Sequence, residues 1–207
     1  MSGFSEILLQ EYGYKLDEQG NHYLKRIVKA AEQMGILIDD LLQVAKVARR
    51  DLEYQKVDLS LVAQEIIKKL QKLDPERQVQ FHVAEGLTVQ GDRELFEIVM
   101  ENLLSNAWKF TAGKDGAVIE LGQAIVDKDR VFYVRDNGIG FETKYVGKVF
   151  GLFQRLHAVD EFSGTGVGLA VTQKIISRHG GRIWAESKVD RGATFYFTLP
   201  DGVVSNV

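Results

Sequence analysis

The prediction of the fold starts from residues 101–109, Glu101-Asn102-Leu103-Leu104-Ser105-Asn106-Ala107-Trp108-Lys109, in a helical pattern that follows Asp92. Asp92 is a typical helix N-cap residue, and apolar residues follow it at helical spacing. Asn102, Asn106 and Lys109 are four and three positions apart, so they lie on one face of this helix. Two amides and an ammonium group suit a hydrated Mg²⁺ bound to phosphates, because this ion takes a few hard oxygen ligands. A solvated polar stripe is the alternative interpretation.

A second motif, Asp136-Asn137-Gly138-Ile139-Gly140-Phe141, follows directly on the predicted strand Val131 to Arg135. Asp136-Asn137-Gly138 is an ordinary turn sequence on its own. Chemically, the Asp136 carboxylate can accept a hydrogen bond from an exocyclic amine, while Gly138 and Gly140 let a flat ring lie against the backbone. An adenine ring fits this description.

The third motif, Ser163-Gly164-Thr165-Gly166-Val167-Gly168-Leu169-Ala170, opens a predicted helix from about Gly166 to Arg178. Unpaired amides at a helix amino terminus attract phosphate, and glycines leave those amides uncovered. The spacing differs from the dinucleotide-binding G-x-G-x-x-G pattern, and the lysine of a Walker A loop is missing. Taken alone, each of the three motifs is a weak signal.

The body of the chain is predicted to be an α+β fold, a two-layer α/β sandwich. We expect a helix at 59–73, which follows a linking stretch, and then strands at 78–83, 87–90, 117–126, 131–135, 182–187 and 193–199. The strands at 117–126 and 131–135 form a hairpin around Asp127-Lys128-Asp129-Arg130. Strands paired by hairpins, with helices on one face, give this fold class.

Ahead of the body, the apolar pattern predicts an antiparallel helical hairpin with helices at 4–14 and about 21–51. Two adjacent heptad seams in the second helix make a stripe that suits a four-helix bundle, so we expect a homodimer. At ~1.5 Å per residue the second helix is about 45 Å long and the first only about 20 Å. We interpret the first helix as shortened by residues missing before Met1; a naturally short helix covered by a neighbouring chain is the alternative. The predicted domains are residues 1–57 and 58–207.

Composition narrows the class of protein. The 207 residues are 45% hydrophobic and 27% charged with a net charge of −3, which is typical of a globular protein of one or two domains. The absence of cysteine excludes disulfides, thiolate metal sites and cysteine nucleophiles. Neither half resembles a nucleic-acid-binding surface. Without a long apolar run or a signal-peptide pattern, a cytoplasmic location is expected, although the parent protein could be membrane-anchored.

In this order, the three motifs resemble those of the sensor histidine kinases of two-component signalling, in the GHKL superfamily shared with gyrase and the heat-shock chaperone ATPases. Asn102 to Lys109 looks like the N box and Asp136 to Phe141 like the first glycine box. Phe150 to Phe153 looks like the F box and Gly164 to Gly168 like the second glycine box. The hairpin is similar to the family's dimerisation and phosphotransfer hairpin, and Gln154-Arg155-Leu156-His157 is similar to its phytochrome-like branch.

The resemblance implies that ATP and Mg²⁺ are the cofactors and gives each matching residue a role. Asn106 is expected to coordinate Mg²⁺, with Asn102 close by, while Lys109 contacts the phosphates and Asp136 binds the adenine amine. The other expected nucleotide contacts are Gly138, Gly140, Gly164, Thr165, Gly166, Gly168 and Leu169.

The resemblance also implies a mobile lid over the nucleotide. Phe150 and Phe153 are expected to anchor this lid, which runs to about Ser163. Arg155 matches the arginine that the family uses near the γ-phosphate.

The amide side chain of Asn102 helps to distinguish phosphoryl transfer from ATP hydrolysis. In the ATPases of the superfamily a glutamate at this position activates water, and an amide cannot act as a general base. Transfer of the γ-phosphoryl group to a positioned side chain is therefore favoured over hydrolysis. The alternatives are a GHKL-type ATPase or serine kinase, and a non-catalytic dimeric scaffold that binds nucleotide.

The histidines depart from the family pattern. The family's acceptor histidine lies a few residues ahead of the match to Gly3-Phe4-Ser5, beside an acidic residue, and the chain has no such pair. We interpret all four histidines as structural or surface residues: His22, His82, His157 and His179. The chain is therefore expected to bind Mg-ATP without phosphorylating itself. A histidine outside it would receive the phosphoryl group and pass it to a response-regulator receiver domain, and a sensor domain would precede Met1.

Overall fold

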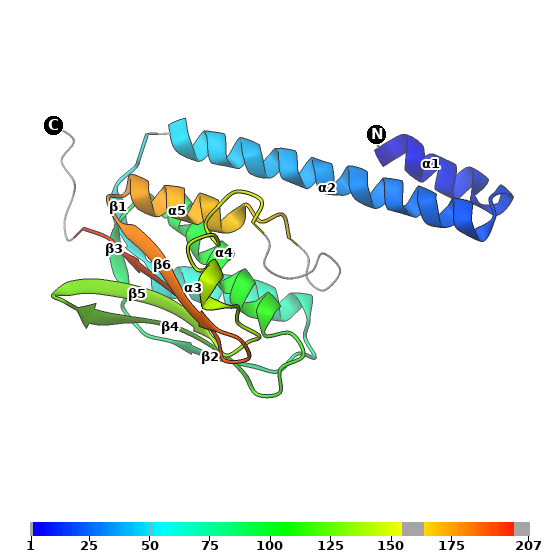
Figure 1. The fold of residues 1–207 in the computed structure, drawn as a ribbon. Helices are drawn as coiled ribbons and strands as arrows, with labels where there is room; N and C mark the ends of the chain where they lie inside the picture. Colours follow the sequence, from blue (N-terminus) through cyan, green and yellow to red (C-terminus); the bar gives the residue numbers. More distant parts are fainter. Residues whose placement is uncertain (1, 50, 155–163, 201–207) are drawn as a thin grey trace. The chain divides into compact units, whose positions relative to one another are not determined.

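The computed structural model describes residues 2–49, 51–154 and 164–200, and the chain forms two compact units, Met1–Ala45 and Lys46–Val207. The first unit is a helical hairpin, and the second is a mixed sheet with helices (Figure 1). The boundary predicted between residues 57 and 58 stays a prediction; in the structure residue 57 lies inside a strand of the second unit.

The hairpin joins α1 (Ser2–Tyr12) to α2 (Glu18–Arg49) through a 3-10 turn, η1 (Gly13–Lys15). The second helix starts at Glu18, about three residues before the predicted start at about residue 21. The Asp17 carboxylate accepts the N–H of Gly20 at 2.6 Å, which satisfies an otherwise unpaired amide of the first helical turn. The helices are 11 and 32 residues long, so the predicted mismatch in length is present.

Large apolar side chains of the predicted seams are exposed on the hairpin of a single chain. Tyr23 is 51% exposed, Ile27 54% and Ile38 58%. Exposed apolar surface of this extent on one helix is typical of an interaction face.

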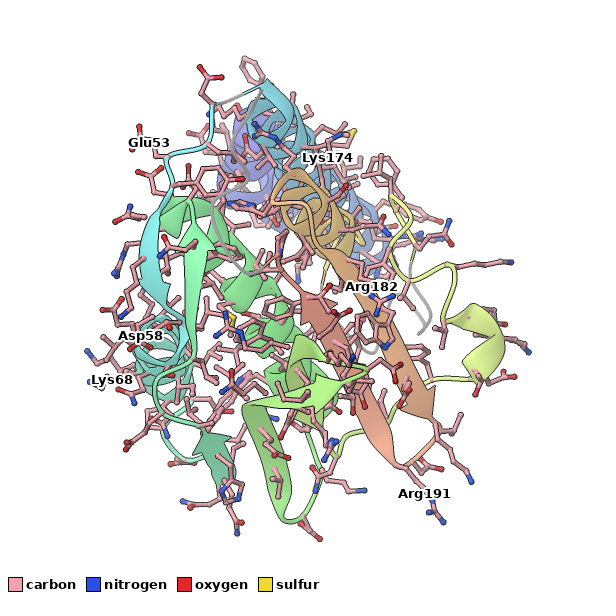
Figure 2. All side chains as sticks on the ribbon, turned by 90° about the vertical axis from the view of Figure 1, so that its left-hand side faces the viewer. Glu53, Asp58, Lys68, Lys174, Arg182 and Arg191 are labelled. Carbon is pink, nitrogen blue, oxygen red and sulfur yellow. The ribbon has the colours of Figure 1, made fainter. Side chains whose placement is uncertain are left out.

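The second unit is built on a five-stranded sheet with the order β2-β4-β5-β7-β6. Its strands are β2 (Val79–Val83), β4 (Ala117–Val126), β5 (Asp129–Asp136), β6 (Arg182–Lys188) and β7 (Gly192–Thr198). Strand β2 runs parallel to β4, and the other neighbours are antiparallel. Figure 2 shows Arg182 where β6 begins and Arg191 at the turn into β7, so this hairpin forms one edge of the sheet.

The linking stretch before residue 59 contains a strand that the sequence pattern did not predict. Strand β1 (Gln55–Asp58) pairs antiparallel with β3 (Thr88–Gly91), with Val57 opposite Val89. Only Val57 of these four residues is buried, so β1 has too few apolar positions for a period-two pattern. The Asp58 carboxylate then caps α3 (Leu59–Leu73) by accepting the N–H groups of Ser60 and Leu61.

Helices α3, α4 (Arg93–Phe110) and α5 (Gly168–Arg178) cover one face of the five-stranded sheet (Figure 1). Helix α3 has the predicted bounds and buries its apolar positions at helical spacing. On the sheet side, Phe132 of β5 stacks on Phe197 of β7 with ring centroids 5.2 Å apart. The predicted two-layer α/β sandwich is confirmed, and the last turns of α4 and the first of α5 meet at one end of it.

Candidate nucleotide-binding site

A cavity of about 220 Å³ opens between the carboxyl end of α4, the loop after β5 and the amino end of α5. It brings together parts of all three motifs, although they are far apart in the sequence. The predicted residues that line it are Asn102, Asn106, Lys109, Asp136, Gly140, Gly164, Thr165, Gly166, Gly168 and Leu169.

Asp136 ends β5 and presents a buried carboxylate to this cavity. It is 6% exposed, and its Oδ1 accepts the N–H of Gly138 at 2.8 Å and the N–H of Ala193 at 3.4 Å. Burial raises its pKa from 3.8 to about 6, and the two backbone donors oppose that shift. The carboxylate is therefore held in place with acceptor capacity left for a ligand.

The two glycines of the second motif have different surroundings. Gly140 lines the cavity with φ +58°, and a Cβ atom there would collide with the carbonyl oxygen of Lys188. Gly138 is not among the lining residues, because its α-carbon packs against the carbonyl of Phe110 at the end of α4. It contributes its N–H to Asp136, whereas the sequence predicted that a ring lies against it.

The polar face of α4 lies where the helical spacing predicted it. Asn102, Asn106 and Lys109 all line the cavity. The Lys109 ammonium is 4.2 Å from the Phe110 ring centroid and 3.3 Å from the position of a Cβ on Gly164. This side of the cavity therefore combines amide oxygens, a cation and the second glycine motif.

Helix α5 begins at Gly168, two residues later than predicted, and its N-cap residue Val167 makes no side-chain cap. The N-cap side chain itself is therefore no acceptor for the first amides of this helix. Gly166, with φ +76°, approaches Gln154, whose carbonyl oxygen lies 2.7 Å from the position of a Cβ. Gln154 and Gly166, which precede and follow residues 155–163 in the chain, therefore lie close together.

Of the three residues assigned to the lid, Phe150 and Phe153 are described, and neither lines the cavity. Phe150 packs edge-on against Phe195 with centroids 6.3 Å apart, and it supports a lining residue without lining the cavity itself. Phe153 is 49% exposed with φ +61° and does not line the cavity. Arg155 lies outside the described residues.

Sequence reasoning gave no role to several lining residues, which are mostly apolar: Ser105, Phe110, Phe141, Val149, Gln154, Ala193 and Phe195. Ala193 and Phe195 alternate along β7 and face the same side of the sheet, so a period-two count from the edge of this strand could have found them. Together with Phe141, whose ring centroid lies 6.5 Å from that of Phe195, they form an apolar wall of the cavity.

Within residues 2–49, 51–154 and 164–200, no group of three or more His, Asp or Glu side chains is placed to hold a metal ion. A metal in this cavity would depend on amide oxygens and ligand phosphates, and this donor set fits Mg²⁺. Over the same residues, no helix combines the length and the apolar character needed to cross a bilayer.

Two family models match the chain. The model described as "Histidine kinase-, DNA gyrase B-, and HSP90-like ATPase" matches residues 91–203, and the one described as "His Kinase A (phospho-acceptor) domain" matches residues 1–50. The first match contains the whole cavity, and the second contains the hairpin.

Individual relatives agree with this match. Cyanobacterial phytochrome B from Nostoc sp. is 37% identical over 203 residues, which cover 96% of this chain and 27% of the phytochrome. The methanogenesis regulatory histidine kinase FilI from Methanothrix harundinacea is 35% identical over 178 residues, 86% of this chain and 20% of FilI. The chain spans about a quarter of the length of the curated relatives that it matches first.

Among solved structures, full-length ShkA in complex with AMPPNP aligns with a TM-score of 0.67 at 22% identity, over 96% of this chain and 42% of ShkA. At this level of identity the likeness supports the fold.

Proposed function

Because the chain belongs to the family of histidine kinase-, DNA gyrase B- and HSP90-like ATPases, we propose that it is the ATP-binding kinase core of a sensor histidine kinase. It binds Mg-ATP in the cavity and transfers the γ-phosphoryl group to a histidine, for relay to an aspartate of a response regulator. The observation that carries this proposal is the convergence of Asp136, the polar face of α4 and the start of α5 on one cavity.

Asp136 recognises the adenine. Its carboxylate accepts a hydrogen bond from the exocyclic amine, and the apolar wall from Phe141 and Phe195 contacts the ring. Gly140 lines the cavity and has no side chain, so the ring can approach its backbone there.

The other end of the cavity binds the phosphates. Asn106 supplies an amide oxygen to Mg²⁺, with Asn102 beside it, and Lys109 contributes a positive charge. Bound Mg²⁺ neutralises phosphate charge. The glycine motif at Gly164, Thr165, Gly166, Gly168 and Leu169 presents backbone amides to the same phosphates. Phe150 and Phe153 anchor the lid, and Arg155 acts near the γ-phosphate. The AMPPNP bound to ShkA, a protein of similar fold, supports this use of the cavity.

Asn102 favours transfer over hydrolysis. Its amide packs against the start of α5 and cannot remove a proton from water. The residues of the cavity therefore act by positioning and charge stabilisation, as phosphoryl transfer requires.

The hairpin and the family membership support three partners for the kinase core. The exposed apolar seams of α2 pair two copies into a homodimer, and a sensor domain and a receiver domain act before and after the core. Because ATP is the donor, the core works in the cytoplasm. The acceptor is not one of the four histidines of the chain, so γ-labelled Mg-ATP should leave no acid-labile label on it; a labelled histidine in the chain would contradict this assignment.

Calorimetry with Mg-ATP tests nucleotide binding. Asp136→Asn should weaken binding about 100-fold, because the site loses the charged acceptor for the adenine amine and gains an amide NH2 that can face this amine. Asp129→Asn is the matched control, since Asp129 lies on the same strand but is exposed and paired with Arg182. Equal affinity in the wild type and Asp136→Asn would overturn the proposed site.

A further inference from the structure

The carboxyl end of α4 is covered by an arginine from the loop before β2. Arg77 Nη2 donates to the carbonyl oxygen of Trp108 at 2.5 Å and to Thr111 Oγ1 at 2.9 Å. Its guanidinium carbon lies 4.1 Å from the centroid of the Trp108 ring. One side chain thus binds both the backbone and the ring of the same residue.

This arrangement suits the end of a helix. The last carbonyls of a helix lack intrahelical donors, and a cation beside them is favoured by the helix dipole. Partial burial lowers the pKa of Arg77 and Asp74 opposes the shift, but a guanidinium stays protonated at neutral pH. The ring of Trp108 has a second contact, because it stacks on the ring of Phe81 of β2. The two ring centroids are 6.0 Å apart, and the interplanar angle is 8°.

Trp108 lies between two residues of the phosphate side of the cavity. Asn106 and Lys109 are in the same helical turn, and both line the cavity. Fixing the carbonyl and the ring of Trp108 therefore fixes the rotation of the turn that presents them.

The adenine-binding side of the cavity is fixed by other contacts than those of Arg77 and Trp108. Asp136 is paired with Ile119 in the sheet, and its carboxylate is fixed by the N–H groups of Gly138 and Ala193. Loosening the end of α4 should therefore disturb the phosphate side more than the adenine side.

We propose that Arg77 is a positioning residue for the phosphate-binding side of the nucleotide site, acting through Trp108 on Asn106 and Lys109. The inference rests on the proposed function, since it assumes that ATP occupies the cavity. This role differs from that of a purely structural helix cap. Loss of such a cap would lower the stability of the protein without weakening Mg-ATP binding more than adenosine binding.

Calorimetric titration of the full chain with Mg-ATP and with adenosine tests it. Arg77→Met should weaken Mg-ATP binding about tenfold and change adenosine binding less than about twofold, because only the phosphate side loses its orientation. Arg93→Met is the matched control: Arg93 lies at the other end of α4, half-exposed and paired with Glu97. This control should leave both affinities unchanged.

Each outcome decides the inference. Unchanged Mg-ATP affinity in Arg77→Met, or an equal loss for both ligands, would overturn it. A wild-type chain that binds neither ligand would instead refute the proposed function.

A second pair of variants covers the case in which Arg77→Met does not fold. Arg77→Lys keeps the charge but loses the planar contact with the ring, so it should weaken Mg-ATP binding about threefold and spare adenosine. A double-mutant cycle combines Arg77→Lys with Trp108→Leu. The losses in Mg-ATP affinity of the two single variants should not add in the double variant, because both remove the contact between Arg77 and Trp108. Additive losses, or no loss in Arg77→Lys, would contradict the proposal.

Discussion

The side-chain oxygen of Asn102 lies 2.6 Å from the position that a Cβ atom on Gly168 would occupy. The amide of α4 thus fills the space left by the missing side chain at the first residue of α5. This contact joins the first motif to the third, and it explains why residue 168 has to be glycine even though its backbone conformation is ordinary.

Gly168→Ala should weaken Mg-ATP binding several-fold with little loss of stability. The added methyl group displaces the Asn102 amide, while alanine favours the helix by up to about 1 kcal/mol relative to glycine. Calorimetry and urea unfolding measure the two effects. Gly147→Ala is the control, since a Cβ at Gly147 meets nothing within 4 Å. Equal affinities in both variants would mean that the contact has no role in binding.

Asp136→Asn should stabilise the ligand-free protein at pH 7. The folded-state pKa is raised from 3.8 to about 6, so the carboxylate's contribution is most favourable below pH 3.8 and is lost as the pH rises through 6. That rise corresponds to about 3 kcal/mol, which is the upper limit of the gain. Urea unfolding at pH 7 and pH 4 checks this, because the gain should shrink at the lower pH. A destabilised variant at pH 7 would contradict the account.

Adenosine binding should weaken about tenfold between pH 7 and pH 5, because protonation of Asp136 removes the charged acceptor. Adenosine is the ligand of choice, since it has no phosphate that titrates in this range. The affinity of Asp136→Asn should be weak and independent of pH. A pH-independent affinity in the wild type would show that Asp136 does not bind the base.

A buried histidine gives the fold an opposite pH dependence. His179 is 2% exposed; its Nε2 accepts the N–H of Asp92 at 3.1 Å and its Nδ1 lies 2.8 Å from the carbonyl oxygen of Ile175. Only the neutral ring with the proton on Nδ1 satisfies both contacts. Burial lowers the pKa of His179 below 6.5, so its stabilising contribution is present above pH 6.5 and is lost as the pH falls.

His179→Leu should therefore be about 2 kcal/mol less stable than the wild type at pH 8, since the N–H of Asp92 loses its acceptor. The difference should shrink towards pH 5, where the wild type must bury a cation or unfold. Urea unfolding of both proteins at several pH values measures it, and the titration of Asp136 cancels in the comparison. A difference that does not vary with pH would contradict a neutral His179.

Local patterns predicted much of the fold. The period of α3, the strands of the β4–β5 hairpin and the polar face of α4 follow from spacing alone, and the resemblance to sensor histidine kinases is confirmed by the family models. Strand β1 was not predicted, because its identity depends on pairing with β3.

Each of the three motifs of the site was predicted from residues that are close in sequence, and only the resemblance to sensor histidine kinases joined the motifs into one site. The apolar wall was missed: the period-two pattern of β7 shows that Ala193 and Phe195 share a face, but only the folded sheet places this strand beside β5. The sequence predicted that the adenine ring lies against Gly138. The carbonyl of Phe110, at the end of α4, occupies the space that a Cβ atom of Gly138 would fill. Such contacts arise from tertiary packing, which the spacing of residues along the chain does not contain.

The comparison of ATP with inosine triphosphate tests the central claim most directly. Inosine triphosphate replaces the exocyclic amine of adenine with a carbonyl oxygen, which repels the Asp136 carboxylate, and its ring N1 carries a hydrogen where adenine N1 is an acceptor. The account predicts that the wild type binds Mg-ATP about 100-fold more tightly than the inosine analogue, and that Asp136→Asn loses this preference because an amide can donate to the carbonyl. Equal affinity of the wild type for the two nucleotides would contradict it.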